Sequence, residues 1–288
     1  MVKNKGSSIT KVILLGTGNP NPDPEHSGCS VLILVGETPY IIDFGANVVR
    51  QAAALTAEYG GPLQELKIRN LCTAFCTHLH SDHTLGLADL ILTPWIMGRK
   101  KPLAVYGPSG MKEMTENILE AYKEDIHYRI DGIEPINKTS WKVITHKIQE
   151  GFIYEDNNIQ VKAFHVHHGT MKNAFGFRFT TPDKTIVISG DTTPCENIIN
   201  YSQNADILIH EVYSQKGFVN LTAAWKKYHA AHHTSSHQLA EIANKCHPRL
   251  LIAYHTLFWG TRDEDILEEI KRYYKGNVAI GRDLQIFH

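Results

Sequence analysis

Four side chains that can bind a metal ion lie close together in the segment 77–83, which reads THLHSDH: His78, His80, Asp82 and His83. The segment follows an apolar run at Leu71–Cys76 that predicts a buried strand, so it forms the loop at the carboxyl end of that strand. Imidazole nitrogens and carboxylate oxygens are ligands that zinc and similar metals bind. Because so short a loop cannot easily direct all of these donors at one ion, the pattern favours two neighbouring ions.

Other candidate ligands also follow predicted strands. They are His165, His167 and His168 near the end of Ile159–Val166, Asp191 after Ile186–Ser189, and His255 after Leu250–Tyr254. Strand alternation puts His165 and His167 on one face and His168 on the other, so spacing alone does not choose among them. A carboxylate such as Asp191 can bridge two cations. An α/β fold gathers its active site at the carboxyl ends of strands, so we expect these residues to meet there.

A third group of histidines surrounds a predicted helix start at Ser235: His229, His232, His233 and His237. Glu211 follows the strand Ile207–His210, and a carboxylate there would hold one of these imidazoles in a single tautomer and raise its pKa. A solvated helix start is the alternative interpretation of this group. His210 itself fits a hydrogen-bonded core histidine better than a ligand.

Composition narrows the class of protein. The chain has 288 residues, 17 of them histidine, with 42% hydrophobic and 20% charged residues and a formal net charge of −1. These values fit a folded globular protein, and the near-zero charge excludes a generally basic nucleic-acid coat but not a local basic patch. No apolar run reaches the roughly 20 residues needed to cross a membrane. The 5 cysteines are scattered and odd in number, so we expect free thiols and a cytoplasmic location.

Short apolar strands alternate with helical patterns along the whole chain, which predicts a layered α/β fold with one domain over residues 1–288. The strands are continuously apolar, so their sheets should be covered on both faces. Helices are predicted over Asn47–Tyr59, Leu85–Met97 and Met111–Lys123, and three later helices are predicted from capping sequences that begin at Thr193, Ser235 and Thr261.

Several motifs make the chain similar to the metallo-β-lactamase superfamily, in its branch of ribonuclease Z and arylsulfatase-like enzymes. The motif His78-x-His80-x-Asp82-His83 resembles the signature of that superfamily. Further similarity lies in Leu15-Gly16-Thr17-Gly18, Ile42-Asp43-Phe44-Gly45, Tyr106-Gly107-Pro108, His168-Gly169, Ser189-Gly190-Asp191-Thr192, Ile209-His210-Glu211, His233-Thr234-Ser235 and Tyr254-His255. The resemblance therefore runs along essentially the whole chain, and it selects His168 from its group.

The resemblance implies a four-layer αββα sandwich that holds two zinc ions per chain, with Mn²⁺ or Fe²⁺ as alternatives. It assigns one ion to His78, His80 and His168, the other ion to Asp82, His83 and His255, and Asp191 to both. It makes Asp43 a partner that orients a ligand. The expected enzyme uses a metal-bridging hydroxide to hydrolyse an ester, with Asp82, His233 and Glu211 as its catalytic residues.

Three functions compete for this site. A hydrolase of small anionic esters, either phosphodiesters or aryl sulfates, is expected first, and a ribonuclease Z-type tRNA 3′-processing endonuclease is the alternative. A β-lactamase-like hydrolase or a redox or non-catalytic metal protein comes last. Short ribonuclease Z enzymes carry a long tRNA-binding arm where Gly169–Gly190 has room only for two strands and a turn, and Thr234-Ser235 reverses that family's usual order. The neutral pI also argues against tight RNA binding.

Phe258 and Trp259 follow His255 in a segment similar to the arylsulfatase-like enzymes, and we expect them to line an apolar pocket for an aromatic leaving group. His26 lies in the loop Thr17–Cys29, which is expected to flank the same cleft. The expected partners are a small anionic ester and a second copy of the chain in a homodimer. RNA is a possible but less favoured partner, and no membrane is expected.

Overall fold

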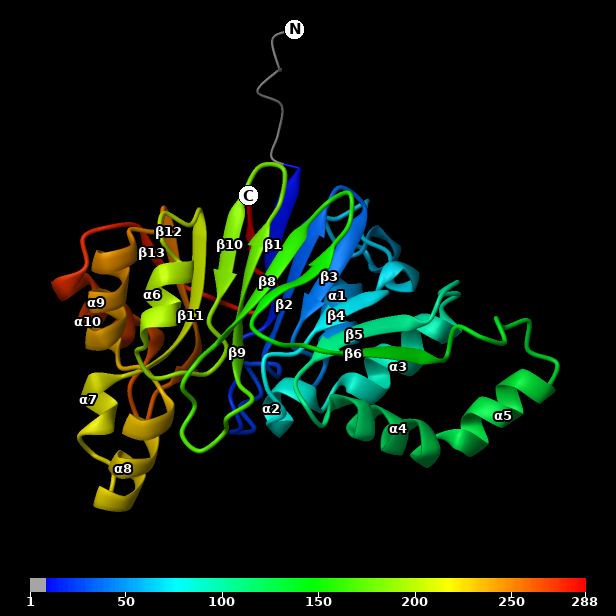
Figure 1. Ribbon diagram of the computed structural model, residues 1–288, viewed down its shortest axis with the longest axis horizontal. Helices are drawn as coiled ribbons and strands as arrows, with labels where there is room; N and C mark the ends of the chain where they lie inside the picture. The colour runs from blue at the N-terminus through cyan, green and yellow to red at the C-terminus, as the bar shows by residue number, and fades with distance from the viewer. Residues whose placement is uncertain (1–8) are drawn as a thin grey trace, which may run out of the picture.

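Two seven-stranded sheets form the centre of residues 9–288, the part of the chain that the computed structural model describes (Figure 1). The first sheet has the order β14-β1-β2-β3-β4-β5-β6, and the second has the order β13-β12-β11-β10-β9-β8-β7. The strands of the first sheet are β1 (Thr10–Gly16), β2 (Ser30–Val35), β3 (Thr38–Ile42), β4 (Thr73–Phe75), β5 (Leu103–Gly107), β6 (Val143–Lys147) and β14 (Ile286–Phe287). Those of the second are β7 (Gly151–Glu155), β8 (Gln160–His165), β9 (Phe175–Thr180), β10 (Thr185–Ile188), β11 (Ile207–Tyr213), β12 (Leu250–Leu257) and β13 (Val278–Ile280).

Helices cover the outer face of each sheet. The first half of the chain contributes α1 (Val48–Ala54), α2 (Ser81–Thr84), α3 (Leu87–Ile96), α4 (Met111–Ala121) and α5 (Lys123–Asp131). The second half contributes α6 (Glu196–Tyr201), α7 (Gln215–Phe218), α8 (Ala223–His232), α9 (Ser236–Cys246) and α10 (Asp263–Tyr273). Figure 1 shows α1 and α3 outside the first sheet, and α6, α9 and α10 outside the second. The expected αββα sandwich is therefore confirmed.

Alternation along the central strands divides the apolar core into layers. In β1, Val12 and Leu14 pack between the two sheets, whereas Ile13 and Leu15 pack toward the helices of the first sheet. Phe177 of β9 joins the layer between the sheets. Since successive side chains of a strand point to opposite faces, a strand that is apolar at every position fits a sheet covered on both sides, as expected.

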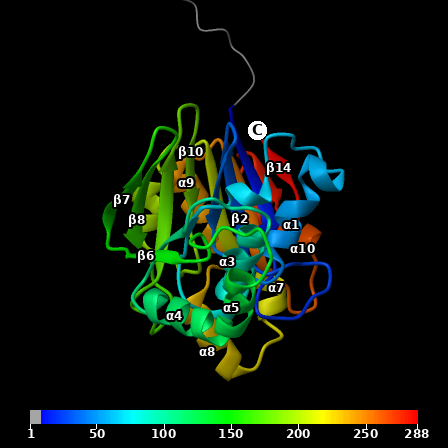
Figure 2. The ribbon, with the colours of Figure 1, turned by 90° about the vertical axis from the view of Figure 1, so that its right-hand side faces the viewer.

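Parallel strands bring the candidate site together at one edge of the sandwich. Neighbouring strands run parallel from β3 to β6 in the first sheet and from β10 to β13 in the second. Within each sheet the carboxyl ends of the parallel strands meet at one edge. The two edges adjoin, since His78 Nε2 on the loop after β4 lies 3.8 Å from Oδ2 of Asp191, which follows β10. Figures 1 and 2 both place α4 and α8 at this end of the molecule.

Two of the three predicted helix caps are wrong. Ser235 caps α9 as expected, since its hydroxyl accepts a hydrogen bond from the Gln238 backbone and its own backbone N–H donates to the Gln238 side chain. However, α6 begins after Cys195 rather than Thr193, and α10 begins after Arg262 rather than Thr261. Both threonines are used in loops instead, because Thr193 donates its N–H to the His167 carbonyl at 2.8 Å and Thr261 donates its hydroxyl to the Phe258 carbonyl at 2.7 Å.

The predicted helix Met111–Lys123 is two helices. α4 ends at Ala121, the chain bends at Tyr122, and α5 continues to Asp131 through a segment whose sequence pattern predicted no element. Among residues 9–288, no helix is long and apolar enough to cross a membrane.

Candidate metal centre

The loop after β4 is held in place by Asp43, which follows β3. Asp43 adopts a left-handed backbone conformation (φ 55°), and its two carboxylate oxygens accept hydrogen bonds from the Thr77 N–H at 2.7 Å and the Thr77 hydroxyl at 2.8 Å. The same carboxylate accepts a hydrogen bond from His83 Nδ1 at 2.8 Å. His83 therefore turns its other nitrogen, Nε2, toward the carboxylates of Asp82 and Asp191, at 3.5 and 3.4 Å.

The predicted ligands gather in two groups that share Asp191. One group is His78, His80, His168 and Asp191, and the other is Asp82, His83, Asp191 and His255. Within each group the candidate ligand atoms lie within 4.8 Å of one another. Asp191 Oδ2 is 3.8 Å from His78 Nε2, and Asp191 Oδ1 is 3.4 Å from His83 Nε2, so the two oxygens of one carboxylate face different groups.

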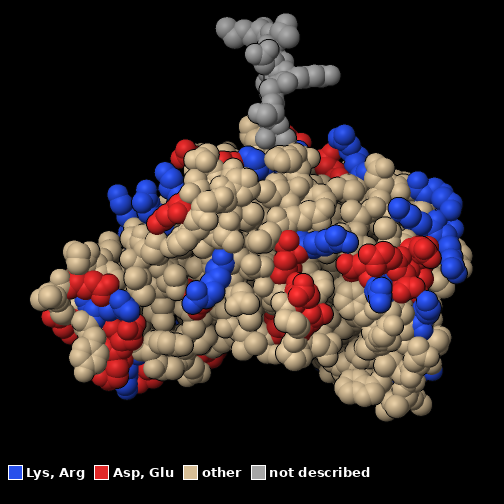
Figure 3. Space-filling model, turned by 180° about the vertical axis from the view of Figure 1, so that it is seen from behind, with Lys and Arg blue, Asp and Glu red and all other residues tan. Residues whose placement is uncertain are grey.

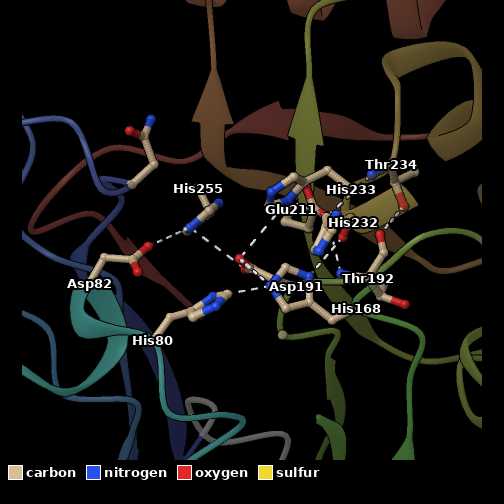
Figure 4. Close-up of polar contacts among 12 residues, drawn as sticks. His80, Asp82, His168, Asp191, Thr192, Glu211, His232, His233, Thr234 and His255 are labelled. Atoms are coloured by element: carbon tan, nitrogen blue, oxygen red, sulfur yellow. Dashed lines mark hydrogen bonds and ion pairs between the residues drawn. The ribbon is translucent and has the colours of Figure 1, made fainter. Parts of the chain in front are cut away.

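The structure distinguishes His168 from its neighbours. His165 and His167 are exposed, whereas His168 is buried and donates a hydrogen bond from Nδ1 to the His232 carbonyl at 2.9 Å. That bond leaves His168 Nε2 facing His80 Nδ1 at 3.1 Å. Figure 4 shows His168 beside Asp191, with His232 behind it.

His255 lies inside a strand and not after it, which corrects the sequence-based prediction. β12 continues to Leu257, but its pairing with β11 skips His255, since Glu211 pairs with Tyr254 and Val212 pairs with Thr256. The skipped residue has a left-handed backbone (φ 47°). Such a bulge bends the strand and redirects one side chain, and here it accompanies a 3.0 Å contact between His255 Nε2 and Asp82 Oδ2.

The donors of the cluster fit a cation. Among the described residues, Asp82 Oδ1, His83 Nε2 and Asp191 Oδ1 are buried and lack a hydrogen-bond partner. Polar atoms buried in this way are costly unless something binds them. Nitrogen and carboxylate donors from histidine and aspartate match zinc and similar divalent metals. The arrangement is therefore compatible with a dinuclear metal site.

His233 and Glu211 form a buried pair beside the ligands. His233 donates from Nδ1 to Glu211 Oε1 at 3.2 Å, and the same oxygen accepts the backbone N–H groups of Thr192 and Thr234 (Figure 4). His233 Nδ1 also lies 3.9 Å from Asp191 Oδ2. The interpretation of His233 as part of a solvated helix start is wrong, because the residue is only 7% exposed.

The expected rise in the pKa of His233 is also wrong. Burial disfavours its charged form and lowers the pKa to about 4, and the Asp191 carboxylate only partly opposes this effect. Burial likewise raises the pKa of Glu211 well above its usual range.

The predicted pocket residues border the cluster. The Trp259 ring lies 4.4 Å from the His229 ring, which in turn lies 5.6 Å from His233. Phe258 faces His26 at 6.0 Å between ring centroids. The loop that carries His26 is anchored because Asp283 accepts hydrogen bonds from the backbone at both of its ends. These contacts place Trp259 near His233, whereas Phe258 and His26 contact each other, and a role of all three in binding substrate stays a prediction.

Sequence reasoning missed two aromatic residues of α8 that lie next to this cluster, Trp225 and Tyr228. Their rings contact His229 and His232, which the sequence had already singled out. The signal was present, since both aromatic residues precede these histidines by four positions, a spacing that places side chains on one face of a helix.

The chain matches one protein-family model and is similar to curated ribonuclease Z sequences. The family model described as Anti-Pycsar protein Apyc1 matches residues 10–255. Ribonuclease Z of Mycobacterium bovis (strain BCG / Pasteur 1173P2) is 28% identical over 281 residues, which cover 96% of this chain and 97% of that protein. Ribonuclease Z of Mycobacterium sp. (strain KMS) is 32% identical over 253 residues, covering 86% of this chain and 85% of that protein.

Solved structures with the same fold are more distant in sequence. The metallo-β-lactamase fold protein YhfI from Bacillus subtilis has a TM-score of 0.73 at 17% identity and covers 96% of this chain and 98% of its own. The short form of human tRNase Z has a TM-score of 0.70 at 21% identity, with the same coverage of 96% and 98%.

Proposed function

Because the chain belongs to the Anti-Pycsar protein Apyc1 family and to the ribonuclease Z-like branch of the metallo-β-lactamase superfamily, we propose that it is a zinc-dependent phosphodiesterase of the ribonuclease Z type. The observation that carries the proposal is the pair of donor groups joined by Asp191, with the His233–Glu211 pair beside them. A dinuclear site with an adjacent proton donor suits hydrolysis of an ester of phosphoric acid.

The ligand assignment follows from the two groups. His78, His80 and His168 would hold one zinc ion, and Asp82, His83 and His255 would hold the other, with Asp191 contacting both. When bound, two such ions supply Lewis acidity and a water that is deprotonated near neutral pH. Mn²⁺ or Fe²⁺ would fit the same donors.

The protein's own residues supply the remaining steps. His80 is only partly buried, so the substrate phosphate reaches the cluster on its side. Glu211 accepts the hydrogen bond from His233 Nδ1, so a proton for the departing oxygen has to come from Nε2 of the doubly protonated ring. Burial lowers the pKa of His233 to about 4, and the negative charge of a bound phosphodiester would favour that protonated form. Asp43 keeps His83 in the orientation that the site needs, and Asp82 positions His255.

RNA is now the favoured substrate, ahead of the small ester that the sequence placed first. The relatives named ribonuclease Z align over nearly their whole length, so they have about the same size as this chain. The shortness of Gly169–Gly190, which leaves no room for a long tRNA-binding arm, is therefore weak evidence against RNA. Relatives of about the same size carry the name ribonuclease Z. The names of these relatives give no support to an aryl sulfate as substrate.

The test is a turnover panel with the zinc-loaded protein. Its arms are a tRNA precursor with a 3′ trailer, an aryl phosphodiester, an aryl sulfate and a β-lactam. We expect cleavage of the precursor at the 3′ end of the tRNA and turnover of the phosphodiester, with both lost in Asp191→Ala. Turnover of the aryl sulfate alone would overturn the proposal, and turnover of the phosphodiester without the precursor would limit it to small phosphodiesters.

A further inference from the structure

Helix α8 carries two exposed aromatic side chains whose rings contact histidines close to the site. Trp225 is 55% exposed and Tyr228 is 41% exposed, and their rings meet edge to face at 5.7 Å. In the space-filling view from behind (Figure 3), the lower edge of the molecule is hollowed, and the lobe at its lower right, on the side of α8, carries few charged side chains.

Two series of ring contacts connect this face to the metal-ligand cluster. Tyr228 stacks on His232 at 4.1 Å and 22°, and the His232 ring meets the His168 ring at 5.2 Å. Trp225 stacks on His229 at 5.5 Å and 25°, and His229 contacts His233 at 5.6 Å. The exposed rings are therefore held in fixed positions relative to a candidate ligand and to the candidate proton donor.

The anchoring of α8 strengthens this connection. The helix begins at Thr222, whose hydroxyl accepts a hydrogen bond from the Trp225 N–H, and it ends where the His232 carbonyl accepts the hydrogen bond from His168. Tyr228 also interacts electrostatically with the cluster. Burial is the largest cause that raises the pKa of its phenol, and the carboxylates of Asp191 and Asp82 raise it further. A group bound at the cluster would thus lie within reach of these rings.

We propose that Trp225 and Tyr228 form a stacking platform for a nucleobase of the substrate, next to the phosphodiester at the metal-ligand cluster. The inference rests on the proposed function, and it adds a subsite for the nucleoside. Aromatic side chains accept any base because every base has a π-face, and each stacked base contributes about 5- to 150-fold in affinity.

A matched pair of substrates isolates the platform. Thymidine 5′-(4-nitrophenyl) phosphate and methyl 4-nitrophenyl phosphate have the same scissile bond and leaving group but differ in the nucleoside. In Trp225→Ala and Tyr228→Ala we expect kcat/KM for the thymidine substrate to fall about 5- to 150-fold, mostly through KM, with the methyl substrate unchanged. Trp225→Phe and Tyr228→Phe keep a ring and should recover most of the loss.

The control is Tyr128→Ala, which removes a tyrosine that is 79% exposed on α5 and should leave both substrates unchanged. Zinc content and thermal unfolding of each variant establish that it is folded. An unchanged ratio between the two substrates in an active, folded Trp225→Ala variant overturns the platform. A change of mass in light scattering, with an unchanged ratio, overturns it in favour of a contact between two copies of the chain.

A binding measurement separates failure of the platform from failure of the proposed function. Trp225 is exposed, so we expect 5′-UMP and a short oligoribonucleotide to quench tryptophan fluorescence, and the quenching to disappear in Trp225→Ala. If 5′-UMP binds as tightly as the oligoribonucleotide does per nucleotide, the ligand of the platform is a free nucleotide. If only the oligoribonucleotide quenches the fluorescence, the ligand is RNA. If wild type cleaves neither phosphodiester, the proposed function fails, and the fluorescence titration then decides the platform alone: absence of quenching overturns it.

Discussion

The two groups of candidate ligands share Asp191 but differ in access to solvent and in charge. In the first group His80 is partly exposed, whereas every member of the second group is buried. The first group contains Asp191 as its one carboxylate, and the second contains Asp82 and Asp191. One half of the cluster is therefore open to solvent at His80, while the other half is enclosed in protein.

This difference appears in the protonation of the histidines. Burial lowers the pKa of His168 to about 4 and lowers that of His78 well below its usual range. Burial alone would lower the pKa of His255 as well, but the carboxylates of Asp191 and Asp82 raise it to about 9. The first half is thus a set of neutral nitrogen donors, and the second is an ion-paired set in which metal would replace protons.

The largest effect should come from the residue that joins the halves. We expect Asp191→Ala to lose metal from both groups and to reduce phosphodiester turnover by roughly 10⁴-fold or more, beyond the loss of a single general acid. Metal analysis and turnover of the aryl phosphodiester measure the two effects. Asp131→Ala, an exposed carboxylate at the end of α5, is the matched control. Near-normal zinc in Asp191→Ala would show that the halves do not depend on this carboxylate.

Variants confined to one half test whether the halves are separable. His168→Ala and His255→Ala each remove one nitrogen donor from one group, so each should lower the metal content from about two to about one ion per chain. The comparison predicts that the enclosed group is the less accessible, so a chelator should strip the remaining metal of His168→Ala more slowly than that of His255→Ala. Loss of both ions in either variant would mean that the cluster binds metal as one unit.

The proton donor should separate from metal binding altogether. We expect His233→Ala to retain its zinc and to lose about 10²–10⁴-fold in turnover, because His233 contacts the carboxylate of Glu211 but belongs to neither ligand group. Glu211→Gln should lose less, since the amide oxygen can still accept the hydrogen bond from Nδ1. A substrate with a better leaving group should be less affected by either change. Unchanged turnover in His233→Ala would remove its catalytic role.

The sequence revealed the loop after β4, which supplies donors to both halves, better than the ligands that follow later strands. Donors on the loop after β4 could be predicted because all of them lie in seven consecutive residues after one strand. His168 could be chosen only by resemblance, since its distinguishing contact is with the His232 carbonyl, 64 positions away. The bulge at His255 depends on the register between β11 and β12, which no local pattern records.

The same limit explains the errors in the fold. The layers follow from continuous apolar strands, which can be read locally. Thr193 and Thr261 carry good capping sequences, but their polar groups are taken by loop contacts that exist only in the folded chain. The pKa of His233 was predicted in the wrong direction because its carboxylate partner is visible in the sequence, whereas the burial that dominates it is not.

The smallest effect is expected from His210, a buried histidine outside both groups. His210 is 0% exposed, its Nδ1 donates to the Glu211 carbonyl at 2.7 Å, and burial lowers its pKa to about 4. An unfolded histidine has a pKa of about 6.5. Between these values the unfolded chain binds more protons, so the free energy of unfolding falls as the pH drops below about 6.5, by about 2 kcal/mol at pH 5.

His210→Phe keeps a ring in the core but cannot bind a proton, so it removes the part of the fall in unfolding free energy that His210 causes at low pH. Between pH 7 and pH 5, metal-free His210→Phe should therefore lose about 2 kcal/mol less of its unfolding free energy than wild type, measured by urea denaturation. His127→Phe, at an exposed position of α5, should follow wild type. Chelation of metal is essential here, because metal bound to the neutral histidines of the first group would add its own pH dependence. Equal slopes for wild type and His210→Phe would mean that His210 gains its proton in the folded protein, and that burial alone does not keep a histidine neutral in this part of the sheet.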